Sequence, residues 1–136
     1  MTLTNSGFSV WALPDNLVEF IIRTFFEQKA PGNTALVKGY LPTGQVYAWL
    51  YTANRHYTIN LDEHEKFRCA ACSRGTLYSL ELCEFTIEET RPNGDIVMNF
   101  WRRIGDESGE GGRAILTHRR NGWAISQRQT EWSTVP

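Results

Sequence analysis

The segment that most constrains this chain is Leu13 to Lys29, which the sequence predicts to be a helix with a wide apolar face. At about 100° per residue, its apolar side chains cover roughly two-thirds of the helical wheel. They are Leu17, Val18, Phe20, Ile21, Ile22, Phe25 and Phe26. A narrow polar stripe remains, formed by Asn16, Glu19, Arg23 and Glu27. A surface helix needs an apolar arc of only about 100°. We therefore expect a concave surface to wrap around this helix.

Most of the remaining chain alternates in the way that is typical of strands, and Asn-Gly between two such runs is a strong hairpin signal. The strand segments are a short one at 35–40, then 45–52, 56–61, 76–90, 95–104, 113–119 and 123–132. A second, shorter helix is predicted over 62–74, where Asp62-x-x-Glu65 resembles a capping box. The acidic segment 105–112 is expected to be a loop. The sequence thus predicts one α+β domain over 1–136, with a cone-like curved antiparallel sheet of about six strands wrapped around the N-terminal helix.

The two Asn-Gly turns predict a register when pairs are counted outward from them. In the first hairpin Ile87 opposes Phe100 on the core face, and Trp101 lies on the reverse. In the second hairpin His118 opposes Ile125 and Leu116 opposes Gln127, with Trp123 on the same side. This register directs His118 and Gln127 toward the core.

The final hairpin resembles a known sequence pattern. Gly112-Arg113, then Arg119-Arg120-Asn121-Gly122-Trp123-Ala124-Ile125 and Arg128, resembles the Gly-Arg … Arg-x-x-Gly-Trp-x-Ile-x-x-Arg ending of ring-hydroxylating dioxygenase small subunits. The order of elements is similar to that of the nuclear transport factor 2 superfamily, which also includes SnoaL-type polyketide cyclases and steroid isomerases. The family usually has two helices before the first strand, whereas one is predicted here. The resemblance implies a cone-shaped fold, dimers through the outer sheet face, and acid–base catalysis in an apolar pocket without a cofactor.

His118 is the candidate catalytic residue, because an inward imidazole can act as general acid or base near neutral pH. The alternative is a half-exposed histidine that merely packs near the hairpin end. Gln127 is either a hydrogen-bond donor to a substrate or a satisfied core amide. The aromatic residues expected to line a ligand cavity are Tyr47, Trp49, Tyr51 and Trp123.

Cys69 and Cys72, with His64 and Cys83, can be interpreted as a four-ligand zinc set. No second cysteine or histidine pair stands at matching spacing, so buried thiols acting as small hydrophobic groups are the favoured interpretation. We therefore predict neither a metal nor a cofactor.

Charge and hydropathy restrict the partners. A net charge of −1 gives no electrostatic reason to expect nucleic acid. No apolar run approaches the roughly 20 residues that span a bilayer, and residues 1–10 lack the pattern of a signal peptide. Three cysteines are too few for a disulfide framework, so we expect a cytoplasmic protein.

Two functions are compatible with these features. The first is a small protein with an apolar pocket that binds a hydrophobic small molecule and converts it as an isomerase, cyclase or dehydratase. The second is a non-catalytic assembly or protein-binding subunit whose cone is filled. In either case a homodimer is expected through the outer sheet face, because a lone tryptophan exposed there, Trp101, is typical of an interface.

Overall fold

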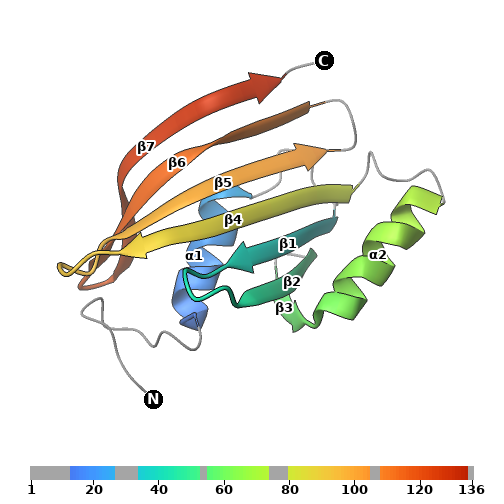
Figure 1. Cartoon of the computed structure of the whole chain (residues 1–136), viewed down its shortest axis with the longest axis horizontal. Coiled ribbons are helices and arrows are strands. Elements are labelled where there is room, and N and C mark those ends of the chain that lie inside the picture. Colours follow the sequence, from blue (N-terminus) through green and yellow to red (C-terminus); the bar gives the residue numbers. More distant parts are fainter. Residues whose placement is uncertain (1–12, 27–33, 53–54, 74–79, 105–107, 135–136) are drawn as a thin grey trace.

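The computed structural model describes residues 13–26, 34–52, 55–73, 80–104 and 108–134. Within these ranges the chain forms two helices and one curved, open sheet of seven strands (Figure 1). The elements are α1 (Asp15–Phe25), β1 (Thr34–Tyr40), β2 (Val46–Thr52), β3 (Arg55–Ile59), α2 (Leu61–Ser73), β4 (Leu80–Thr90), β5 (Ile96–Ile104), β6 (Ser108–Arg119) and β7 (Gly122–Thr134). The α+β class is confirmed. The strand count differs from about six because the short first segment is a full strand in the sheet.

The strand order is β3-β2-β1-β4-β5-β6-β7. Strands β1 and β4 pair in parallel, and all other neighbouring strands pair antiparallel. A parallel pair needs a long crossover connection, and β2, β3 and α2 lie between β1 and β4 in the chain. Within the described ranges, neither helix is long and apolar enough to cross a bilayer.

Helix α1 covers one face of the sheet, called the α1 face here. Pro14 is the N-cap residue of the helix, and its carbonyl oxygen accepts hydrogen bonds from the N–H groups of Leu17 and Val18 at 3.1 Å. The apolar side of the helix is buried, with Leu17, Ile21 and Ile22 fully enclosed. The described part of the polar stripe lies toward solvent. The wide apolar face is therefore confirmed; the predicted last residues, 27–29, lie outside the described ranges.

Helix α2 begins at Leu61, and its capping box lies two residues before the predicted one. The Asn60 side-chain oxygen accepts a hydrogen bond from the Glu63 N–H at 2.8 Å, and the Glu63 carboxylate accepts one from the Asn60 N–H at 3.2 Å. Asp62 and Glu65 cannot form this reciprocal pair, because both lie inside the helix. The correct capping box is thus Asn60-x-x-Glu63.

Both hairpins are confirmed, but their predicted registers are wrong. In the first, Pro92, Asn93 and Gly94 form a longer loop and the strands bulge at Glu88, so Ile87 pairs with Met98. Phe100 instead pairs with Phe85 on the α1 face.

In the second hairpin the two turn residues are Arg120 and Asn121, and Gly122 (φ +129°) already belongs to β7. His118 therefore pairs with Trp123, and Leu116 with Ile125. A bulge beyond Ile125 then reverses the faces of β7.

The predicted acidic loop 105–112 is also partly wrong, because strand β6 begins at Ser108. Gly109 and Gly111 lie beneath the indole of Trp132. A Cβ on Gly111 would lie 2.3 Å from the indole Nε1, so a glycine is needed there for the ring to lie flat on the sheet. Residues 105–107 are outside the described ranges.

Candidate functional site

The aromatic residues predicted to line a cavity from β2 lie on the α1 face. Trp49 and Tyr51 are each 4% exposed, and Tyr47 packs against the same core. The Trp49 ring stacks on Phe85, with ring centroids 5.7 Å apart. Gly39 makes room for this contact, since a Cβ there would lie 2.4 Å from the Phe85 ring. In the described part of the chain these rings pack as core beneath α1.

His118 lies at the turn end of the final hairpin. Its side chain is exposed and stacks on the Trp123 ring, with centroids 4.7 Å apart. Trp123 is partly buried against the core, and its indole Nε1 has no hydrogen-bond partner among the described residues. The histidine is therefore on the predicted face of the strand, but at the rim of the sheet rather than deep within it.

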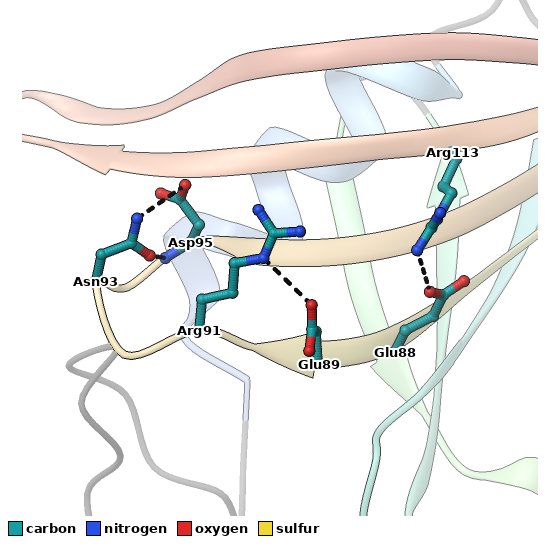
Figure 2. A network of polar contacts seen from close by, with 6 residues as sticks. All are labelled: Glu88, Glu89, Arg91, Asn93, Asp95 and Arg113. Carbon is teal, nitrogen blue, oxygen red and sulfur yellow. Dashed lines mark hydrogen bonds and ion pairs between the residues drawn. The ribbon is translucent and has the colours of Figure 1, made fainter.

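Gln127 lies on the outer face, which is a correction of the predicted inward position. It pairs with Ile115, because the β7 bulge shifts the register. It lines a hollow of about 490 Å³ together with Val97, Arg91 and Arg113. Figure 2 shows that both arginines are engaged, Arg91 with Glu89 at 3.2 Å and Arg113 with Glu88 at 2.9 Å. Long polar side chains thus cover the apolar floor of this part of the sheet.

The zinc interpretation gains no geometric support. Cys83 is 1% exposed on the α1 face, whereas His64 belongs to α2, which lies on the opposite face. Cys69 is exposed and donates its thiol hydrogen to Glu65 at 3.4 Å, so the expectation that it is buried is wrong. The Cys72 side chain lies outside the described part. Within that part, no group of three or more histidine, cysteine or acidic side chains could hold a metal ion.

A buried polar cluster on the α1 face is the strongest candidate site. Glu81 is 0% exposed and Arg102 is 8% exposed, and an Arg102 guanidinium N–H donates to Glu81 Oε1 at 2.9 Å. Pairing of Ala35 with Glu81, and of Cys83 with Arg102, places both side chains on the apolar side of the sheet. Glu81 Oε2 is buried and has no hydrogen-bond partner among the described residues.

The cluster continues across β6 and β7 to the end of α1. Arg102 Nε lies 3.3 Å from Glu110, and Arg128 lies 3.8 Å from the same carboxylate. The Arg128 guanidinium also sits over the rings of Phe25 and Phe100, at 5.0 and 5.3 Å from their centroids. Cationic side chains over aromatic rings are attracted by the ring face. The site therefore combines an apolar wall with two arginines and two carboxylates.

Burial dominates the electrostatics of this cluster. It raises the pKa of Glu81, and the nearby Arg102 and a hydrogen bond with the Cys83 thiol oppose that rise without cancelling it. Burial also holds the pKa of the adjacent Cys83 thiol well above its ordinary value, which makes the thiol inert. A carboxyl group whose pKa is raised by an apolar surround holds its proton more readily than an exposed glutamate, which is a feature of acid–base sites.

Sequence analysis overlooked this cluster. One signal was available, because Glu81 alternates with Cys83, Phe85 and Ile87 in a strand whose odd-numbered residues face the core. Alternation with Phe100 already directs Arg102 inward, whereas its pairing with Cys83 depends on the bulge at Glu88 and on the length of the turn.

Comparison of the chain with protein-family models, with curated proteins and with solved structures finds no match. The candidate site must therefore be interpreted from its own geometry.

Proposed function

We propose that the α1 face binds a hydrophobic small molecule with a carbonyl group, and that the protein moves a proton on that molecule by acid–base chemistry. The observation that carries this proposal is Glu81, a fully buried carboxyl group whose Oε2 has no partner among the described residues. Its raised pKa makes it a stronger base than an exposed glutamate. Isomerase, cyclase and dehydratase reactions all include such a proton transfer.

The neighbouring side chains have complementary roles in this proposal. The rings of Phe25 and Phe100 provide an apolar contact for the body of the ligand, and their centroids lie 4.7 Å apart. The Arg128 guanidinium above these rings provides a positive charge for an oxygen that becomes negative when a neighbouring C–H proton is removed. Glu81 accepts that proton. We also propose that the protein belongs to the nuclear transport factor 2 superfamily and that it is cytoplasmic.

Proton transfer can be tested without knowing the natural substrate. Exchange of the α-protons of α-tetralone in deuterium oxide, followed by proton NMR, reports on any base that reaches a carbonyl compound. We expect the wild type to accelerate exchange and Glu81→Gln to lose that acceleration by about 100-fold or more. Glu89→Gln, which alters an exposed carboxylate of the same strand, is the matched control and should exchange as the wild type does. Equal rates for the wild type and Glu81→Gln would eliminate Glu81 as the base.

His118 stays a predicted catalytic residue, and the same assay tests it. His118→Ala should remove activity and leave the fold intact if the sequence-based assignment is right. Because its side chain is exposed at the hairpin end, a reaction at His118 would take place at the rim of the sheet. Loss in only one of the two variants therefore assigns the reaction to the rim or to the buried cluster.

A non-catalytic assembly domain is the second candidate function. It is favoured by the close packing of the described α1 face, where Leu17, Ile21 and Ile22 are 0% exposed. Close packing of this kind is what an assembly domain with a filled core requires. Absence of any α-tetralone exchange or binding by the native protein would favour this function over the enzymatic one.

A further inference from the structure

A hollow of about 310 Å³ lies between α2 and the outer face of the sheet. Leu36 and Lys38 of β1 line it, and these residues alternate with Ala35 and Val37, which face α1. The hollow and the buried Glu81 cluster are therefore on opposite sides of the sheet. Small-molecule pockets have volumes of about 300–1,000 Å³, so this hollow has room for a small ligand.

The floor of the hollow is apolar. Leu36 is fully buried, and Leu82 and Trp101 are partly buried beside it. The predicted exposed tryptophan of the outer face is thus half covered in the described structure. An indole ring in this position offers a flat, apolar contact to another planar group.

The rim of the hollow is predominantly cationic. Among its described lining residues, Lys38, Arg68 and Arg103 are cations and Glu84 alone is a carboxylate. Glu84 accepts a hydrogen bond from Tyr40, and this contact, together with burial, raises the Tyr40 pKa. Lys38 and Arg68 are close enough to lower the pKa of His64, although burial is the larger cause.

His64 provides an unused polar atom in the wall of the hollow. The side chain is 5% exposed, and its Nδ1 has no hydrogen-bond partner among the described residues. Burial and the nearby cations keep the imidazole neutral at neutral pH. Buried polar atoms in proteins nearly always have a partner, so an unpartnered one at a hollow indicates a place for a ligand group.

We propose that this hollow is a second binding site, separate from the α1 face, for a small organic anion with a flat apolar body. The body of the anion lies against Trp101 and Leu36, and its acidic group faces Lys38 and Arg68. Three cations, Lys38, Arg68 and Arg103, stand against two nearby carboxylates, Glu65 and Glu84, so an acidic ligand group balances the excess positive charge. A bare inorganic anion would leave the apolar floor uncovered. The chemistry of the lining therefore fits an aromatic carboxylate.

Calorimetry with three probes tests both parts of the proposal. Naphthoate carries the ring and the charge, naphthylmethanol carries only the ring, and inorganic phosphate carries only the charge. We expect naphthoate to bind with a Kd below about 1 mM, and each of the other two probes to bind at least about tenfold more weakly. No naphthoate binding, or equal binding of either partial probe, would overturn the proposal.

Two arginines provide a matched pair of variants. Arg68 pairs with Glu65 at 3.3 Å and Arg23 pairs with Glu19 at 3.1 Å, and all four side chains are about half exposed on helices. Of these two arginines, only Arg68 lines the hollow. Arg68→Gln should weaken naphthoate binding by about threefold to tenfold, whereas Arg23→Gln should leave it unchanged. Equal effects would show that naphthoate responds to overall charge and would overturn the assigned site.

A measurement on the wild type avoids any effect of substitution on folding. The groups that face His64 are Lys38 on β1 and Glu65 and Arg68 on α2. A bound carboxylate adds a negative charge to this group, so naphthoate should raise the His64 pKa in an NMR titration. An unchanged His64 pKa at saturating naphthoate would place the ligand elsewhere and overturn the proposal. Because Glu81 lies on the opposite face, failure here leaves the α-tetralone test unaffected.

Discussion

The described part of the chain buries three polar residues, Glu81, Arg102 and His64. The groups around each side chain determine its charge. Arg102 is held between two carboxylates, so its charge is compensated even though it is 8% exposed. Burial raises the pKa of Glu81, although Arg102 and the Cys83 thiol oppose the rise. Burial, together with Lys38 and Arg68, lowers the pKa of His64, while Glu65 opposes the shift.

Removing Arg102 should destabilise the protein strongly. Arg102→Met leaves the Glu81 carboxylate buried without its partner, and such a loss costs about 3–5 kcal/mol at neutral pH. A carboxyl group with a raised pKa stabilises the fold at low pH and loses that contribution as pH rises through its folded pKa. The loss in Arg102→Met should therefore be smaller at about pH 5 than at about pH 8 in urea unfolding. The double variant Glu81→Gln/Arg102→Met should recover part of the loss, and an equal loss at both pH values would contradict the explanation.

His64 should make the stability fall in acid. Its pKa is lower in the folded state than in the unfolded chain, so its contribution is present above about pH 6.5 and is lost as pH falls through the folded pKa. The groups facing it are Lys38, Arg68 and Glu65. His64→Gln should reduce the slope of unfolding free energy against pH in this window, because it removes the titrating imidazole. Identical slopes in the wild type and His64→Gln would show that another group is responsible.

The secondary-structure elements were predictable to the extent that their signals are local. The wide apolar face of α1 and the two Asn-Gly hairpins are read from neighbouring residues, and both are present. The α2 capping box was misplaced by two residues, because Asn60 and Asp62 are equally good cap residues from the sequence alone. Register was not predictable, since a bulge has no reliable sequence signal and reverses every side chain beyond it. The Glu81 cluster draws on four separate strands, so it could not be assembled without the register.

Helix α1 should be sensitive on its buried side only. Phe25 is 2% exposed, and its ring centroid lies 4.7 Å from that of Phe100. Phe25→Ala should therefore cost about 3–5 kcal/mol of unfolding free energy. Arg23→Ala removes a pair between exposed side chains and should cost less than about 1 kcal/mol. Denaturant melts measure both. Comparable losses in the two variants would contradict the packing of α1 against the sheet.

In the described part of the chain, the sheet has one helix on each face. Helix α1 covers the side that carries the aromatic core, and α2 covers the outer side near β1 and β2 (Figure 1). Strands β6 and β7 are at the far end of the strand order from β2. There the outer face carries Trp132, which is 47% exposed and lies over Gly109 and Gly111. An exposed indole on a flat glycine surface is a feature typical of interfaces.

The homodimer through the outer face remains a prediction, and Trp132 is the better place to test it. Trp101 is half covered in the α2 hollow, so replacing it would disturb that hollow as well as any interface. Trp132 pairs with Gly111, which pairs with Trp101 in turn, so both indoles stand on the same face.

If two copies associate there, Trp132→Arg should give a folded monomer on sizing chromatography with light scattering, because a buried unpaired charge opposes association. Phe67→Arg, at an equally exposed apolar residue of α2, should leave the dimer intact. A wild type that is already monomeric at high micromolar concentration would refute the dimer, and equal dissociation by both variants would place the interface over α2 instead.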